Sequence, residues 1–106
     1  MVNKVVRKIL FLICLIFLAT VLKADPKMIL GLEVYNNKAL CGSCHVLQSA
    51  KSVGQIGPNL DQLKPQISQI IYAVKNGIGV MPAFEGVLSK DEIDAVAYYV
   101  FSSTQE

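Results

Sequence analysis

The sequence predicts an all-α protein with three main helices joined by long loops. Apolar side chains recur at helical spacing in three segments, residues 26–37, 64–75 and 89–102. No segment alternates apolar and polar residues as a half-buried strand does, and no stretch repeats another. Long loops in so short a chain usually wrap a bound group, so we expect the loops to enclose one.

The N-terminus has the composition of a secretory signal peptide. Three basic residues precede an apolar run over residues 9–22, and the small residue Ala24 follows it. We expect cleavage after Ala24, which divides the chain into a signal peptide at residues 1–24 and one domain at residues 25–106. The alternative is an uncleaved membrane anchor, although the run of 14 residues is shorter than the roughly 20 that span a bilayer.

Cleavage would reverse the sign of the net charge. The whole chain has 10 Lys and Arg against 8 Asp and Glu, a formal charge of +2. Four of these bases and none of the acids lie in residues 1–24, so residues 25–106 carry 6 bases against 8 acids, a formal charge of −2. The domain has no arginine and no basic cluster, so we expect no nucleic-acid partner.

The first two helices of the domain have recognisable ends. Asp25 can cap the helix predicted at residues 26–37, and Pro26 suits the first helical position, where a missing N–H costs nothing. The second helix is expected at about residues 64–75, where four apolar residues share one face. Gly77 follows as a C-terminal stop signal.

The last helix has the clearest start signal in the chain. Ser89 followed by Glu92 fits a capping box, in which each side chain binds the backbone N–H of the other residue. Leu88 and Ile93 fit the apolar pair that often closes such a cap. We expect this helix to run to about Ser102.

Residues 41–45 read Cys-Gly-Ser-Cys-His, and C-x-x-C-H is the attachment sequence for c-type haem. The thiols of Cys41 and Cys44 would each add across one haem vinyl group, and His45 would ligate the iron. A zinc site would need three or four protein ligands, and only two Cys and one His remain after cleavage. A dithiol redox motif would need a βαβ pattern, and a structural disulfide would leave His45 without a role.

Two further residues fit this site. Met81 lies in a loop of small residues that ends in a stiff proline, which would let the chain lie flat against a haem face. Only Met28 and Met81 remain after cleavage, and Met28 fits the apolar face of the first helix, so we expect Met81 to be the second iron ligand. The carbonyl of Pro58 is a candidate acceptor for the second ring N–H of His45, with a simple turn as the alternative.

These motifs resemble those of the class I c-type cytochromes, near the short single-haem bacterial group. CGSCH, GPNL and VMP occur in that order between an N-terminal and a C-terminal helix, and the resemblance covers nearly all of residues 25–105. It implies the class I cytochrome c fold, with one covalent haem c and its iron. It also implies a close crossing of the first and last helices, where Gly31 and Tyr35 would meet Tyr99 or, as the alternative, Tyr98.

The chain departs from this family in two places. Some relatives bind a haem propionate through a Trp, and this chain has none, so Gln55, Asn59 and Gln62 are the candidates for that contact. The segment from Tyr35 to Cys41 is also longer than in the shortest members of the family.

Two protein ligands would leave the iron no open position, so we expect a one-electron carrier and not an enzyme. Met opposite His, in an apolar pocket, would favour a positive reduction potential. The expected protein is a periplasmic monomer with no membrane span after cleavage. Its partners would be a donor dehydrogenase or cytochrome complex and an acceptor oxidase. The alternative function is a dedicated cytochrome subunit of a periplasmic dehydrogenase, for example one that oxidises sulfite.

Overall fold

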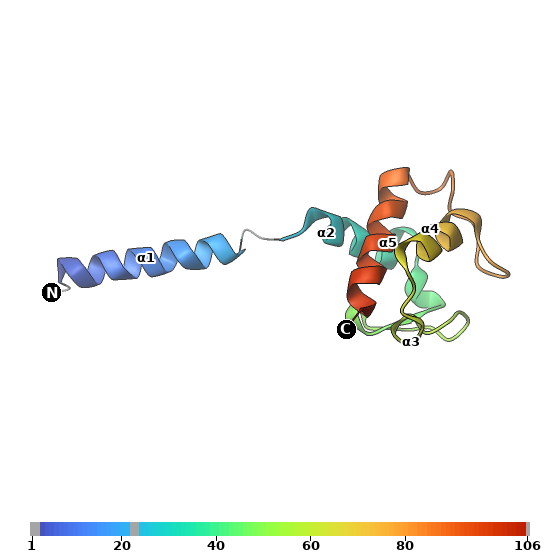
Figure 1. The fold of residues 1–106 in the computed structure, drawn as a ribbon, viewed down its shortest axis with the longest axis horizontal. Helices are drawn as coiled ribbons and strands as arrows, with labels where there is room; N and C mark the ends of the chain where they lie inside the picture. The colour runs from blue at the N-terminus through green and yellow to red at the C-terminus, as the bar shows by residue number, and fades with distance from the viewer. Residues whose placement is uncertain (1–2, 22–23, 106) are drawn as a thin grey trace.

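The computed structural model describes residues 3–21 and 24–105 (Figure 1). Its α-helices are α1 (Lys4–Val21), α2 (Pro26–Glu33), α3 (Leu60–Leu63), α4 (Ile67–Asn76) and α5 (Lys90–Thr104). Two strands of two residues each, β1 (Val46–Leu47) and β2 (Ser52–Val53), form an antiparallel pair. The prediction of an all-α fold is confirmed, and this small hairpin is an addition that the sequence pattern did not predict.

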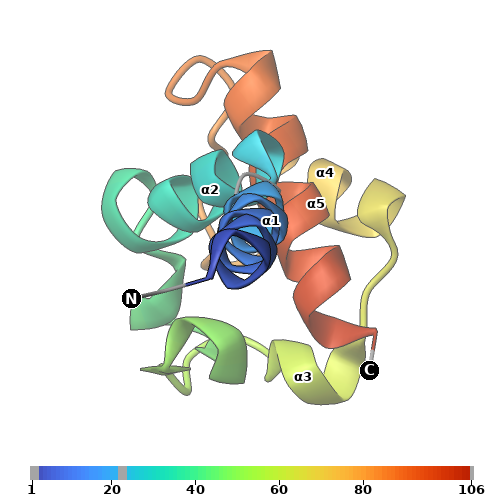
Figure 2. The same ribbon diagram turned by 90° about the vertical axis from the view of Figure 1, so that its left-hand side faces the viewer.

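Helix α1 contains residues 9–21 of the apolar run of the predicted signal peptide, and Leu22 lies outside the described residues. Figure 1 shows it apart from the helices that follow, Figure 2 views it end-on, and its side chains at residues 4–17 are exposed. Among the described residues, no helix is long and apolar enough to cross a membrane. Cleavage after Ala24 stays a prediction.

Helix α2 begins as predicted and ends differently. The Asp25 side chain accepts a hydrogen bond from the backbone N–H of Lys27 (2.9 Å), and Pro26 is the first helical residue. The α-helical pattern stops at Glu33, and the chain continues as one π-helical turn over Val34–Lys38. A π-helical turn holds more residues than an α-helical turn, so it accommodates the long segment that precedes the cysteines.

Helix α4 begins three residues later than the predicted Lys64. The short helix α3 comes first and ends at Lys64, which has a left-handed backbone conformation (φ 48°). Pro65 follows, and a proline disfavours the helical conformation of the residue before it. The helix then starts with a capping box between Gln66 and Gln69. It ends at Asn76, one residue beyond the predicted end, and Gly77 caps it as the predicted stop signal.

Helix α5 has the predicted capping box. Ser89 Oγ accepts from the backbone N–H of Glu92 (3.1 Å), and Glu92 Oε1 accepts from that of Ser89 (3.0 Å). The predicted apolar pair, Leu88 and Ile93, is buried. The helix extends to Thr104, two residues beyond the predicted end.

The core centres on the crossing of α2 and α5, which lie side by side in Figures 1 and 2. A Cβ atom at Gly31 would lie 2.3 Å from the Ala95 carbonyl oxygen and 2.5 Å from Tyr99 Cβ, so the helices approach closely only because residue 31 is glycine. The rings of Tyr35 and Tyr99 are 6.0 Å apart between centroids and tilted by 59°. Tyr98 contacts the start of α2 and not the region of Gly31: its hydroxyl donates to Asp25 (3.0 Å), and Lys27 Nζ lies 5.2 Å from its ring centroid.

Candidate functional site

Residues Cys41–Ser43 form a single 3₁₀ turn after the π-helical turn. The backbone N–H groups of Cys44 and His45 both donate to the Cys41 carbonyl oxygen, at 3.1 and 3.0 Å. This turn sets the two cysteines and the histidine on one short, hydrogen-bonded unit. Both thiols are free and half-buried.

The surroundings of Cys41 keep its sulfur protonated. Burial raises the pKa of the Cys41 thiol to about 11. At neutral pH Cys41 is therefore a protonated thiol and not a thiolate, the form that binds a metal ion directly. A neutral thiol has the S–H bond that adds across a vinyl group to form a thioether.

The ring of His45 is held by the backbone of the loop that contains Pro58. Its Nδ1 donates to the Pro58 carbonyl oxygen over 2.7 Å, because a carbonyl oxygen can only accept. The neutral imidazole then has its lone pair on Nε2, which is the form that binds a metal. A Cβ atom at Gly57 would lie 2.5 Å from His45 Cε1, so the ring lies flat against the backbone there.

Met81 closes a tight turn after α4. The backbone N–H of Met81 donates to the Ile78 carbonyl (2.9 Å), and the N–H of Ile78 donates to the Met81 carbonyl (3.2 Å). Gly79 has a positive φ (57°) at the first central position, where type II′ turns take glycine. The Met81 side chain is half-buried and packs against the hydrophobic core.

Of the predicted site residues, the two cysteines, His45 and Pro58 come together in one loop region, and Met81 lies in a separate loop. Asn59 caps α3, and its Oδ1 accepts from the backbone N–H of Gln62 (3.3 Å). Its side-chain NH₂ group is the part of Asn59 that could donate to a haem propionate.

Sequence reasoning missed Ser52 beside His45, and it missed the hydrogen bond between Ser52 and Tyr35. Ser52 Oγ donates to the His45 carbonyl oxygen (3.0 Å), and the Tyr35 hydroxyl binds Ser52 Oγ (2.8 Å). The β1–β2 pairing sets this register, with Leu47 opposite Ser52. No local pattern singles out this serine, since the hairpin has only two residues in each strand.

The described residues fit a haem group. They contain a dithiol turn, an imidazole with a free Nε2 and a half-buried thioether, and they hold no cluster of three or more His, Cys, Asp and Glu that would suit a metal ion alone. Large apolar side chains are exposed on the loops that contain these groups, which suits a flat apolar group lying against them. These are Val53 (78%), Ile56 (71%), Ile78 (60%) and Val80 (86%).

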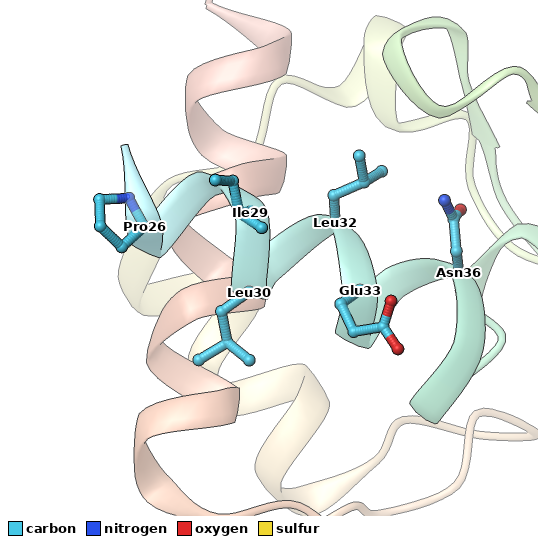
Figure 3. A pocket seen from close by; sticks show the side chains of 6 residues that line it. All are labelled: Pro26, Ile29, Leu30, Leu32, Glu33 and Asn36. Carbon is cyan, nitrogen blue, oxygen red and sulfur yellow. The ribbon is translucent and has the colours of Figure 1, made fainter. Parts of the chain in front are cut away.

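An open apolar depression lies elsewhere, along the outer face of α2 (Figure 3). Its volume is about 520 Å³ and none of the predicted haem residues contributes to it. The residues that line it are Pro26, Ile29, Leu30, Leu32, Glu33 and Asn36.

Comparison with known proteins gives consistent matches. Residues 28–100 match the family described as cytochrome C oxidase, cbb3-type, subunit III. Cytochrome c6 of Leptolyngbya boryana is 35% identical over 81 residues, which cover 72% of this chain and 92% of that protein. The chloroplastic cytochrome c6 of Chlamydomonas reinhardtii is also 35% identical, over 73% of this chain and 55% of that protein.

A solved structure is also similar to this one. The c-type cytochrome SorU from Sinorhizobium meliloti has 44% sequence identity and a TM-score of 0.73. The alignment covers 78% of this chain and 97% of that one.

Proposed function

Because the chain belongs to the class I c-type cytochromes, we propose that His45 and Met81 ligate the iron of an exported electron carrier. The family match spans residues 28–100, and the structural match confirms the class I cytochrome c fold. The chain is a single-haem electron carrier whose cofactor is one covalent haem c with its iron. The ligands, the thioether residues and the location are our proposals.

The hydrogen bond from His45 Nδ1 to the Pro58 carbonyl is the observation that carries the ligand assignment. It fixes the tautomer that leaves Nε2 free, and it makes the imidazole a stronger electron donor. Cys41 and Cys44 flank this histidine on the same turn, so we assign them to the two thioether bonds. The thioether of Met81 supplies the second iron ligand from the other loop.

The proposed ligands would suit an electron carrier and not an enzyme. A bound haem supplies a one-electron couple. Two protein side chains on the iron leave no position for a substrate, and a methionine opposite a histidine raises the reduction potential. Both side chains belong to loops fastened by hydrogen bonds to the backbone, which would limit their movement when the iron changes oxidation state.

We place the mature domain at residues 25–106, in the periplasm, after removal of residues 1–24. The basic, apolar and small-residue segments of the N-terminus support export. The partners would be a donor dehydrogenase or cytochrome complex and an acceptor oxidase. Electron-transfer contacts of this kind are small, below roughly 1,200 Å² in total.

The test is the visible spectrum of the mature holoprotein compared with Met81→Leu and Met28→Leu. Met28 is a matched control, because it is also a half-buried methionine that packs against the core. We expect a low-spin spectrum in the wild type and in Met28→Leu, and loss of the weak red-end band of ferric methionine ligation in Met81→Leu alone. A Met81→Leu spectrum identical to that of the wild type would refute this ligand assignment.

A further inference from the structure

Two tyrosines at the helix crossing bind two serines of the loop that follows His45. The Tyr35 hydroxyl of the π-helical turn lies 2.8 Å from Ser52 Oγ, and the Tyr99 hydroxyl of α5 lies 2.8 Å from Ser49 Oγ. Their rings are in contact, with centroids 6.0 Å apart. The loop is therefore attached to the most buried part of the core at two points.

Of these two tyrosine–serine pairs, only Tyr35 and Ser52 are also hydrogen-bonded to His45. Ser52 Oγ donates to the His45 carbonyl oxygen (3.0 Å), and the Leu47 carbonyl oxygen is a second, longer acceptor (3.5 Å). Because its single proton is used on these carbonyl groups, Ser52 Oγ accepts from the Tyr35 hydroxyl. Burial raises the pKa of Tyr35 to about 12, so this phenol stays protonated and can donate at any physiological pH. The chain of hydrogen bonds runs from Tyr35 through Ser52 to the backbone of His45.

His45 is consequently held at both ends. Its ring nitrogen donates to Pro58, and its carbonyl oxygen accepts from Ser52. The backbone N–H of His45 also donates to the Cys41 carbonyl oxygen (3.0 Å). The bond from Ser52 adds a restraint on the carbonyl side of the residue, where the Cys41 bond does not act, so it limits rotation of the peptide group and of the ring attached to it.

We propose that Ser52 is a positioning residue that fixes the imidazole plane of His45 by holding its carbonyl oxygen. The inference rests on the proposed role of His45 as an iron ligand. Through its hydrogen bond with Tyr35, Ser52 connects the orientation of His45 to the crossing of α2 and α5.

Ser49 provides a matched control. It lies in the same loop and also binds a core tyrosine, but its other hydrogen bond comes from Ser103 Oγ (3.2 Å) and not from the backbone of His45. Ser49→Ala and Ser52→Ala each remove one hydroxyl that binds a tyrosine. They differ in whether the lost hydroxyl also contacts His45.

The experiment compares these two variants as ferric holoproteins by NMR. The first measurement is the solvent exchange rate of the His45 Nδ1 proton. We expect Ser52→Ala to increase it about fivefold, the factor that corresponds to the loss of one neutral hydrogen bond, and Ser49→Ala to leave it unchanged. The second measurement is the paramagnetic shifts of the haem methyl protons, which depend on the plane of the axial imidazole. We expect these to change in Ser52→Ala alone.

Equal effects of the two serine variants, or no effect of either, would overturn the proposal. Should Ser52→Ala fail to fold, Tyr35→Phe replaces it and Tyr99→Phe becomes the control, since phenylalanine keeps each buried ring and removes only the hydroxyl. A smaller change in the same direction is expected for Tyr35→Phe. The wild-type spectrum tests the proposed ligands separately, because a high-spin wild type would refute the ligation before any serine variant is compared.

Discussion

The ring of His45 is bound by a backbone carbonyl and not by another side chain. A carbonyl oxygen cannot take up the ring proton, so the imidazole keeps the same tautomer wherever the ring is neutral. The Gly-Pro pair before Asn59 allowed Pro58 to be predicted as the acceptor from sequence. The contact of Gly57 with the ring could not be predicted, because it depends on how the loop folds back over residues 41–45.

At this position, Gly57→Ala should displace the His45 ring. The added methyl group would lie 2.5 Å from Cε1 and 2.9 Å from Nδ1, and the imidazole cannot yield without weakening its bond to Pro58. We expect the free energy of unfolding to fall by about 1–3 kcal/mol, as for other overpacked sites. Urea titration of the holoprotein measures this change. Lys51→Gln, an exposed change in the same loop, should have almost no effect, and equal stabilities of the two variants would contradict the prediction.

Among the elements, α5 is connected to the π-helical turn by one carboxylate. Glu92 Oε2 binds Lys38 Nζ (2.6 Å), and its Oε1 accepts from the backbone of Ser89. The hydrogen bond from Lys38 is the main reason that the pKa of Glu92 is lowered, to about 2. The same side chain therefore completes a helix cap and holds the turn that leads to the cysteines.

The lowered pKa of Glu92 predicts a specific dependence of stability on pH. A carboxyl with a lower pKa in the folded state stabilises the fold above its ordinary pKa of 4.5, and this contribution is lost as the pH falls toward about 2. We expect the urea midpoint of the wild type to fall over this range by more than that of Glu92→Gln. Glu85→Gln is the control, since its ion pair with Lys75 is longer (3.8 Å) and exposed. A Glu92→Gln variant with the same pH profile as the wild type would rule out this contribution.

The helices show which features of the fold are determined by residues close together in the sequence. The caps at Asp25 and Ser89 are set by residues within one helical turn, and both were predicted correctly. The π-helical turn depends on contacts with distant residues, as Lys38 reaches Glu92 across 54 positions of the chain. The close crossing at Gly31 was predicted only because the family resemblance pointed to it, and the choice between Tyr98 and Tyr99 needed the structure.

On the scale of the whole molecule, we expect the haem to complete the core. A domain of roughly 80 residues buries too little apolar surface to be very stable by itself. The loops of this chain expose several large apolar side chains, and Val53 and Val80 are the most exposed of them. The fold class and the cofactor could be predicted from three short motifs, whereas the packing of the loops around the site could not, because it depends on residues far apart in sequence.

If the haem completes the core, the double variant Cys41→Ser, Cys44→Ser should lose thermal stability as well as its cofactor. Without thioether bonds the haem is not retained covalently, and we expect the melting temperature to fall by at least about 10 °C, or roughly 2 kcal/mol for a domain of this size. Circular dichroism measures the melting, and haem staining of a denaturing gel measures retention. Ser43→Ala, an exposed change within the same turn, should preserve both. A double variant with the same melting temperature as the wild type would contradict this prediction, because the polypeptide core would then be stable without the haem.

The turn that contains Met81 also offers a place to attach a reporter. Its ends are fastened by two backbone hydrogen bonds between Ile78 and Met81, so its shape depends little on the side chain at its tip. Val80 occupies that tip and is 86% exposed. A linker to an electrode or a fluorophore placed at residue 80 would stand one residue from the proposed iron ligand, and it would replace only the apolar contact that Val80 is expected to make with the haem. The protein could then be attached to an electrode surface through the loop that contains the proposed ligand Met81.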